Sequence, residues 1–365
     1  MKQLLRSRLV FILLLIPSII FAEGCETIDK AKYTKEKTIQ KSFNVSSDAT
    51  LKVNNSYGNI DVITWNENRI EFDIIVKVSG NDEEKVEKRL GDIDVKFSSS
   101  DNWVSAETMF GKKKSSSWWN WGKKSKLKME VNYVIKMPIT NNVNLNNDYG
   151  AINLDKLEGK AQLNCDYGKI TTKELMADDN IINFDYSRNC YFEYIKSGKI
   201  NADYSGFTIA KAKNLDINAD YTKSVIEVAE DVNYNCDYNG LTINSANNVT
   251  GNGDYLSLRL GTIYKNASIK SDYGSIKIDR MASNAGNLDI ESDYAGITIG
   301  YDAAYSFDFR IKLQNAGLRN SDDFEFNKRR IESRDKYYEG YHGNSGSGNT
   351  ITVNSEYGSV TFKKK

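Results

Sequence analysis

An Asp-Tyr pair that returns at a nearly constant interval constrains the fold of this chain more than any other feature. Successive copies are separated by 17 to 21 residues. The tyrosines of the regular run are Tyr149, Tyr167, Tyr186, Tyr204, Tyr221, Tyr238, Tyr255, Tyr273 and Tyr294. Outlying Tyr-Gly copies stand at Tyr57 and Tyr357. A period of this length is typical of proteins in which each repeat stacks on the next.

Apolar and polar residues alternate on both sides of each tyrosine. Ile217 precedes Tyr221 by four positions, and Ile276 and Ile278 follow Tyr273 at alternate positions. This pattern predicts a strand, a corner and a second strand in every repeat. One such unit cannot bury its own apolar face, so we expect repeats to pair in parallel at about 4.8 Å. An antiparallel sandwich also gives short alternating strands, but it does not explain the constant interval.

The predicted fold is therefore all-β, a parallel β-helix or β-solenoid of roughly nine to ten coils, each 17 to 21 residues long. The alternation places each tyrosine on the same side as the apolar residue four positions earlier. We therefore expect the rings to point inward and to form a stacked ladder. Gly follows several of the tyrosines, as at Gly58 and Gly274, and is expected to supply the positive φ of the corner.

The segments that flank the regular run have a different texture. Long alternating strands between Lys41 and Met137 enclose a helix expected from about Asp82 to Leu90, with Asn81 or Asp82 as its cap. We expect this region to cover the first coil, because a bare end exposes strand edges. After Ile299 the period fails, through a charged stretch that reads as a long loop or a C-terminal cap insertion. The predicted division is a signal peptide at 1–22, a β-rich N-terminal cap at 23–138, solenoid repeats at 139–300, and the C-terminal insertion with the last solenoid strands at 301–365.

The first residues predict export. Three cations precede an apolar run that ends at Phe21 and Ala22, which is typical of a secretory signal peptide. No later segment approaches the roughly 20 apolar residues of a membrane-spanning helix. Gly24 precedes Cys25 as in a lipoprotein signal, but Ala22 and Glu23 fit that signal poorly, so a lipid anchor is not favoured. The expected location is the periplasm, the outer-membrane surface or the medium.

The charge balance narrows the range of partners. The chain has 49 Lys and Arg and 49 Asp and Glu, so its formal net charge is zero. A neutral chain is a poor general partner for nucleic acid or another anionic polymer. A glycan or an envelope protein is the expected partner.

Two polar columns accompany the tyrosines. The aspartates that precede them are Asp148, Asp166, Asp185, Asp203, Asp220, Asp237, Asp254, Asp272 and Asp293. Neighbouring carboxylates about 5 Å apart repel by about 1 kcal/mol in water. Backbone N–H groups in local Asx-type turns are the expected compensation, with bound Ca²⁺ as the less favoured alternative and no other cofactor expected. The asparagines three positions before the tyrosines are Asn146, Asn164, Asn183, Asn201, Asn218, Asn235 and Asn252, and they predict a stacked amide ladder, although such a row also suits a glycan.

Other residues that carry chemistry give fewer signals. Trp118, Trp119 and Trp121 lie in a basic, Ser-rich loop, where they suit a sugar ring or a lipid headgroup boundary, or else pack on the cap. Cys165 and Cys236 occupy the same inward position four coils apart, which is too far for a disulfide, so both are expected to be buried free thiols. The single histidine, His342, has no recognisable catalytic partner and the chain lacks metal-type Cys/His spacing, so no catalytic, cofactor or metal residue is assigned.

Short sequence segments resemble a known family. The Tyr-Gly-x-Ile copies at Tyr57, Tyr149, Tyr167 and Tyr273, with the segments NSYGNIDVITW and NYVIKMP, look like the putative adhesin family DUF4097 of Bacteroidetes. The resemblance implies a β-solenoid and an envelope location, and it supplies no catalytic residues. The function expected is an exported, adhesin-like binding or structural protein that is not an enzyme. The alternatives are a periplasmic structural or regulatory component with a protein partner and, more remotely, a polysaccharide-active enzyme on a β-helix.

Overall fold

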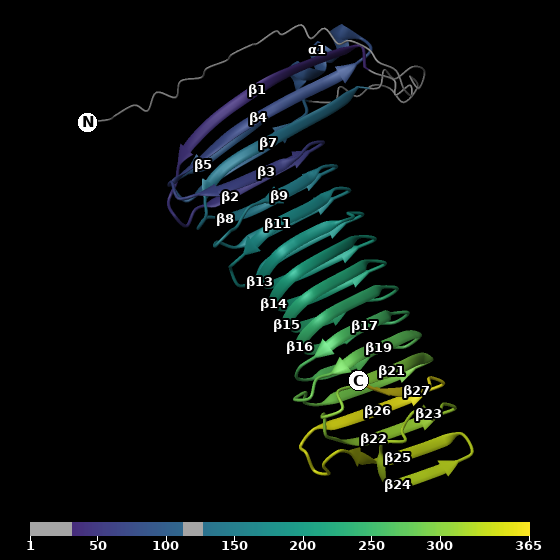
Figure 1. Ribbon diagram of the computed structural model, residues 1–365. Coiled ribbons are helices and arrows are strands. Elements are labelled where there is room, and N and C mark those ends of the chain that lie inside the picture. Colours follow the sequence, from purple (N-terminus) through teal and green to yellow (C-terminus); the bar gives the residue numbers. More distant parts are fainter. Residues whose placement is uncertain (1–30, 112–126) are drawn as a thin grey trace, which may run out of the picture. The chain divides into compact units, whose positions relative to one another are not determined.

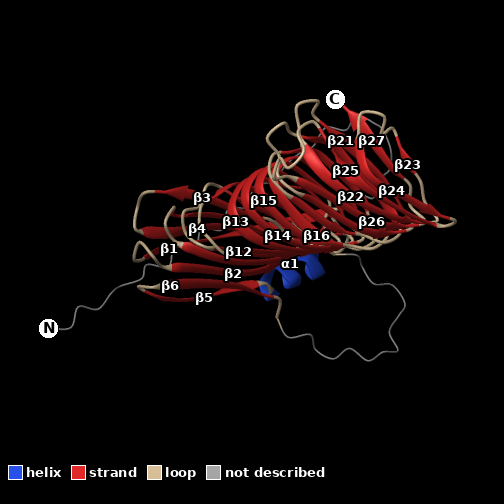
Figure 2. Ribbon diagram, turned by 90° about the horizontal axis from the view of Figure 1, so that it is seen from below, coloured by secondary structure: helices blue, strands red, loops and turns tan. Residues whose placement is uncertain are grey.

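The computed structural model describes residues 31–111 and 127–365. The predicted signal peptide, Cys25 and the Trp118, Trp119 and Trp121 cluster lie outside these residues. The described chain is mostly strand, with α1 as the one helix within it (Figure 1, Figure 2). Contacts divide the chain into two compact units, residues 1–153 and residues 154–365, which are described separately here.

The first unit contains the helix and two sets of paired strands. Its elements are β1 (Tyr33–Asn44), β2 (Thr50–Ser56), β3 (Ile60–Trp65), β4 (Arg69–Gly80), α1 (Glu83–Asp92), β5 (Asp94–Ser100), β6 (Trp103–Met109), β7 (Lys128–Pro138), β8 (Asn142–Asp148) and β9 (Ala151–Leu154). In one set β4 pairs antiparallel with β1 and β7, and β7 pairs in parallel with β3. In the other set β2 pairs in parallel with β6 and β8. The inward alternate residues of these strands, such as Val53, Val62 and Ile74, are almost fully buried.

The predicted helix is confirmed. Asp82 is the N-cap and its side chain accepts a hydrogen bond from the backbone N–H of Lys85 at 3.2 Å. Glu83 and Glu84 lie in the first turn, where negative charge is favourable. Val86 is the buried anchor of the helix. At ten residues α1 is short, and the described chain has no helix long and apolar enough to span a membrane.

The second unit begins with strands that repeat along the chain. These are β10 (Ala161–Asp166), β11 (Lys169–Leu175), β12 (Asn180–Asp185), β13 (Cys190–Asp203), β14 (Gly206–Asp220), β15 (Lys223–Asn235), β16 (Gly240–Asn252), β17 (Ser257–Ile263), β18 (Ala267–Lys270), β19 (Gly274–Met281), β20 (Leu288–Asp293) and β21 (Ala295–Tyr301). Each strand pairs in parallel with the strand one repeat later, so that Val225 lies beside Thr208 and Thr242. Parallel stacking of the repeats is therefore confirmed. The residue four positions before the tyrosine is buried as predicted, as at Ile182, Ile200 and Ile217.

The C-terminal residues add six strands to this unit. They are β22 (Phe307–Gln314), β23 (Leu318–Arg319), β24 (Glu325–Glu332), β25 (Asp335–His342), β26 (Thr350–Glu356) and β27 (Val360–Lys364). β26 and β27 continue the parallel pairing of β20 and β21. β25 pairs antiparallel with β22 and β24. An aromatic cluster of Tyr301, Phe307, Phe324 and Phe362 packs around His342, which is 6% exposed.

Each repeat turns its corner at the tyrosine. Every motif tyrosine from Tyr57 to Tyr357 has a left-handed backbone, with φ between 51° and 64°. The expectation that the following glycine supplies the positive φ is therefore wrong. Gly274 is needed for a different reason, because a Cβ there would lie 2.1 Å from the carbonyl oxygen of Leu256 in the preceding repeat.

Candidate functional site

The motif tyrosines stack into a ladder. In the second unit it consists of Tyr167, Tyr186, Tyr204, Tyr221, Tyr238, Tyr255, Tyr273, Tyr294 and Tyr357, with successive ring centroids 4.6 to 5.2 Å apart and ring planes within 10° of parallel. In the first unit Tyr57 and Tyr149 stack at 5.3 Å, and the edge of Phe110 packs against Tyr57. These distances fall within the range at which aromatic rings attract one another.

The ladder faces solvent, so the predicted inward orientation is wrong. Tyr221 is 49% exposed and Tyr167 is 53% exposed, although their apolar neighbours four positions earlier are buried. Side chains alternate strictly only along an extended backbone, and the left-handed tyrosine interrupts the alternation, so that the aspartate before it and the tyrosine itself both lie on the outer side. Each tyrosine therefore points outward, and the residue after it points inward.

The exposed ladder is larger than a soluble monomer usually presents. A tyrosine side chain offers roughly 150 to 250 Å², so nine half-exposed rings leave on the order of 900 Å² accessible. Contiguous apolar patches on monomers seldom exceed about 600 Å². The rings cover one another's faces, so the surface offered to a partner consists of ring edges and phenol hydroxyls. Exposed stripes of this size on soluble proteins are often found at interaction sites.

A left-handed backbone is unfavourable for tyrosine. It costs about 1 kcal/mol or more in residues that have a Cβ, which is why glycine normally takes such positions. Stacking on two neighbours offsets this penalty, at about 0.5 to 1.5 kcal/mol for each aromatic pair. The tyrosines are therefore stabilised at this corner by one another.

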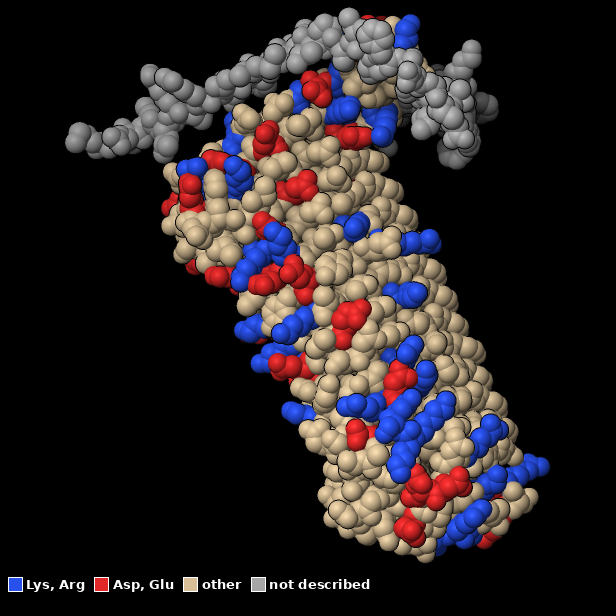
Figure 3. All heavy atoms as spheres, viewed as in Figure 1, with Lys and Arg blue, Asp and Glu red and all other residues tan. Residues whose placement is uncertain are grey.

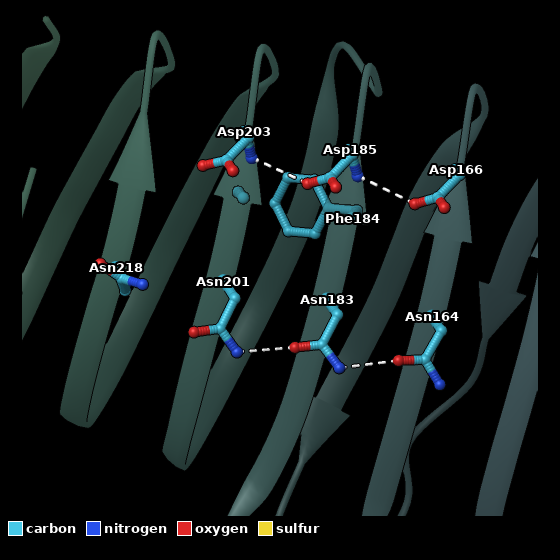
Figure 4. A pocket seen from close by; sticks show the side chains of 9 residues that line it. Asn164, Asp166, Asn183, Phe184, Asp185, Asn201, Asp203 and Asn218 are labelled. Atoms are coloured by element: carbon cyan, nitrogen blue, oxygen red, sulfur yellow. Dashed lines mark hydrogen bonds between the residues drawn. The ribbon is translucent and has the colours of Figure 1, made fainter. Parts of the chain in front are cut away.

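The aspartates form a column beside the ladder. The Oδ1 of Asp166 accepts the backbone N–H of Asp185 at 3.2 Å, and that of Asp185 accepts the N–H of Asp203 at 3.0 Å (Figure 4). The same contact continues through the later repeats. Backbone donors do compensate the carboxylates, but they come from the next repeat and not from a local Asx-type turn. Among the described residues, no three His, Cys, Asp or Glu side chains lie together in a way that could hold a metal ion.

The asparagines form a second column on the same face. Asn183 donates to the Oδ1 of Asn164 at 2.7 Å, and Asn201 donates to Asn183 at the same distance (Figure 4). Asn252 and Asn235 repeat the contact further along. A shallow groove of about 300 Å³ lies over the two columns between Asn164 and Asp203. This flank of the ladder therefore offers carboxylate and amide groups to solvent.

The opposite flank of the ladder has small and basic residues. Two positions after the tyrosines stand Lys169, Arg188, Gly206, Lys223, Gly240, Ser257, Ser275 and Gly296. A Cβ added at Gly240 or Gly296 would meet no atom within 4 Å, and neither residue has a positive φ. Glycine weakens a strand, so these residues have no evident role in folding. Because the glycines have no side chain, nothing projects beside the rings at these positions.

Basic side chains extend this flank toward the C-terminus. Arg259 and Lys277, four positions after their tyrosines, are strand neighbours on β17 and β19. Both bind the carboxylate of Asp279, at 2.8 and 3.1 Å. Figure 3 shows Lys and Arg gathered over β17, β19 and β21. The ladder thus separates an acidic flank from a small and basic one.

A buried polar ladder lies directly behind the rings, and the sequence analysis missed it. Its members are Ser187, Ser205, Thr222 and Asn239, each following a motif tyrosine. The backbone N–H of Ser205 donates to the Thr222 hydroxyl at 3.1 Å, and that hydroxyl donates to the carbonyl of Ala202 at 3.0 Å. Consecutive repeats are joined in this way at their corners. The available signal was the small polar residue that follows Asp-Tyr in these copies.

The remaining candidate residues lie in the core. Cys165, Cys190 and Cys236 are buried free thiols, as expected for Cys165 and Cys236. Burial raises the pKa of Cys165 and of Cys236 to about 12 and that of Cys190 to about 11. The Nδ1–H of His342 donates to the Tyr305 carbonyl oxygen at 2.8 Å, inside the aromatic cluster. None of these groups meets the exposed ladder.

Comparison with known proteins gives remote structural matches only. No family model matches the sequence, and no curated protein matches it. A putative adhesin from Parabacteroides merdae is 13% identical, with 89% of this chain and 96% of that chain covered and a TM-score of 0.33. A putative cell adhesion protein from Clostridium sporogenes is 14% identical, with coverage of 90% and 100% and a TM-score of 0.16. A putative lipid binding protein from Parabacteroides distasonis is 8% identical, with coverage of 89% and 96% and a TM-score of 0.27.

Proposed function

We propose that this chain is an exported, adhesin-like binding protein of the cell envelope that engages its partner along the tyrosine ladder and has no catalytic role. One observation carries the proposal, namely the continuous run of half-exposed, stacked rings in residues 154–365. Tyrosine edges and hydroxyls supply a rigid, amphipathic contact surface at low conformational cost. The ladder spans about 40 Å in eight steps, which suits an extended partner.

The sequence adds three parts to this proposal. The chain is assigned to the DUF4097 putative adhesin family on its Tyr-Gly-x-Ile copies. Its fold is assigned as a β-solenoid of about nine to ten coils, between a cap at 23–138 and the C-terminal residues 301–365. Export rests on the charged and apolar pattern before Ala22.

Catalysis has little support from the side chains. Polysaccharide-active enzymes on β-helices need converging acid and base groups in a cleft. The groove between Asn164 and Asp203 has carboxylates that are fixed by backbone N–H groups and repeated in every coil. A group that recurs in each repeat with the same contact serves the architecture. The alternative, a periplasmic structural or regulatory component with a protein partner, could use the same ladder and differs in location and role.

The proposal is tested by binding to isolated cell envelopes. A ladder variant carries Tyr204→Asn, Tyr221→Asn and Tyr238→Asn. It loses three rings, but asparagine tolerates the left-handed backbone of the corner. A matched control changes Lys213→Ser and Glu230→Ser, two exposed residues away from the tyrosine corner. We expect binding to weaken at least tenfold in the ladder variant and to be unchanged in the control, with circular dichroism confirming the fold of both. Equal binding by the three proteins would refute the proposal, and protease shaving of intact cells separates the surface from the periplasm.

A further inference from the structure

We propose that the ladder of residues 154–365 binds the ladder of a second copy of this chain, side by side and running in the same direction. This inference rests on the proposed function, because it names the partner of the same surface. It comes from the unequal charge of the two flanks, from the area of the ladder and from the symmetry that two identical surfaces must obey.

The two flanks of the ladder carry opposite charge. The residue before each tyrosine is acidic in all nine repeats of this unit, with Asp at eight positions and Glu356 at the last. The positions two and four residues after the tyrosines contain no acidic residue in residues 154–365 and hold the cations Lys169, Arg188 and Lys223. Arg259 and Lys277 stand there too, but Asp279 offsets part of their charge. Each copy therefore has one flank that is complementary to the other flank of its partner.

Symmetry then selects one orientation. Two identical surfaces meet across a two-fold axis. A contact from one residue of the first copy to another residue of the second is therefore repeated with the copies exchanged. An axis parallel to the stack places the Asp column of each copy opposite the small and basic flank of the other. An axis across the stack would reverse the direction of one ladder and place Asp against Asp, with a repulsion of about 1 kcal/mol per close pair in water. The charge pattern therefore favours parallel ladders.

The dimensions of the surface suit a dimer. On the order of 900 Å² of accessible ring surface on each copy corresponds to about 1,800 Å² in total, which is the size of an ordinary specific interface. Gly206, Gly240 and Gly296 have no side chain, which leaves room for the partner's aspartates on the flank that would receive them. Both ladders have the same repeat spacing, so a contact made at one repeat recurs at the others. Without residues 1–22 the chain has 46 basic and 49 acidic residues, so its formal net charge is only −3 and the overall repulsion between copies is small.

The first experiment measures mass in solution. We expect the mature full-length chain to be a dimer at micromolar concentration in low salt and to dissociate as salt screens the flank charges. A variant with Asp203→Asn, Asp220→Asn and Asp237→Asn retains the side-chain oxygen that accepts the backbone N–H but loses the charge. A second variant carries Lys169→Glu, Arg188→Glu and Lys223→Glu. Each is expected to weaken dimerisation about tenfold or more, and the Lys213→Ser and Glu230→Ser control is not.

The second experiment tests orientation. In a Cys25→Ser background, Tyr186→Cys and Tyr294→Cys, the second and eighth of the nine rungs, are introduced separately. With parallel ladders each position faces its own counterpart, so each single variant forms a disulfide dimer on oxidation. Reversed ladders in full overlap would link Tyr186→Cys to Tyr294→Cys only in a mixture of the two variants, and that result would overturn the proposal.

The outcomes separate the two proposals. A wild-type chain that is monomeric in low salt overturns the dimer, and if the ladder variant still loses envelope binding, the proposed function stands with another partner. A dimer that is insensitive to both flank variants also overturns the inference. If the ladder variant still forms a dimer and still binds envelopes, both proposals are refuted.

Discussion

The ring of Tyr234 lies against Gly251, its strand partner one repeat later. A Cβ at Gly251 would lie 2.4 Å from both Cδ1 and the carbonyl oxygen of Tyr234. The same position of the buried row holds Ile217 in the repeat before Tyr234 and Ile269 in the repeat after Gly251. The large side chain of one repeat is therefore accommodated by the missing side chain of the next.

We expect Gly251→Ala to destabilise the protein by about 1 to 3 kcal/mol, because the added methyl group overlaps both the ring and the backbone. The matched control is Gly240→Ala, where a Cβ meets no atom within 4 Å. That change should be neutral or stabilise by up to about 1 kcal/mol, since alanine restricts the unfolded chain. Denaturant titration of both variants measures the difference. A similar loss in the two would contradict the close packing at Tyr234.

Tyr234→Phe should stabilise the protein. The Tyr234 hydroxyl is buried and has no hydrogen-bond partner among the described residues. Burial also raises the pKa of this phenol above its usual value. Removing an unpaired buried hydroxyl is expected to gain about 1 kcal/mol. Thermal denaturation measures the gain, and a loss of comparable size would indicate a partner for the hydroxyl in solution.

Thr222→Val tests the buried polar ladder at the corners. The substitution keeps the shape of the side chain but leaves the N–H of Ser205 and the carbonyl of Ala202 without their partner. We expect a loss of about 1 to 3 kcal/mol. Thr208→Val is the control, because Thr208 is half-exposed on the outer row of the same coil and should change stability by less than about 0.5 kcal/mol. Equal effects in chemical denaturation would show that the corner hydroxyl is dispensable.

Tyr221 tests stacking and backbone strain together. Tyr221→Ala removes contacts to two rings while keeping a Cβ at φ 51°, and should cost about 1 to 3 kcal/mol. Tyr221→Gly removes the same contacts but also relieves the strain, so it should be about 1 kcal/mol more stable than the alanine variant. Tyr357→Ala, which loses the stack on Tyr294, should cost about half as much as Tyr221→Ala. Melting curves of the three variants provide the comparison.

The buried thiols predict an alkaline loss of stability. Burial raises the pKa of Cys236 from the ordinary thiol value of 9.0 to about 12, so the folded state favours the protonated form. This contribution is fully present below about pH 9 and is lost as the pH rises toward 12. We expect melting temperatures to fall as the pH rises from about 9 toward 12, and the fall to be smaller in Cys236→Ala. Ala219 occupies the same position one repeat earlier, so alanine fits there. An identical pH dependence of the two proteins would contradict the assignment.

The sequence predicted most of what depends on periodicity. Spacing predicted the parallel stacking and the amide ladder, and alternation predicted the inward row of Ile182 and Ile217. Capping predicted the helix after Asp82. These features arise from local pattern and burial, which a single sequence carries directly.

The orientation of the candidate site could not be predicted in the same way. The alternation rule assumes an extended backbone, and it fails at one left-handed residue such as Tyr221. Nothing in the tyrosine itself indicates this conformation, because an isolated tyrosine disfavours it and only the stacked neighbours stabilise it. The role of Gly274 was misjudged for a related reason, since the approach of Leu256 comes from another repeat. Contacts between repeats decided both features.

The corner contacts also bear on how such a chain can change in length. Three contacts at the corners join only adjacent repeats. They are the stack of Tyr221 on Tyr204, the hydrogen bond from the Asp220 N–H to Asp203, and the hydrogen bond from the Ser205 N–H to Thr222. Removing residues 205–221 would bring Thr222 directly after Tyr204, with an Asp-Tyr corner and a buried polar residue still in sequence. A gene duplication or loss of this size therefore preserves the corner contacts and can lengthen or shorten the protein at such junctions, whereas the junction between Tyr234 and Gly251 also requires its matched core pair.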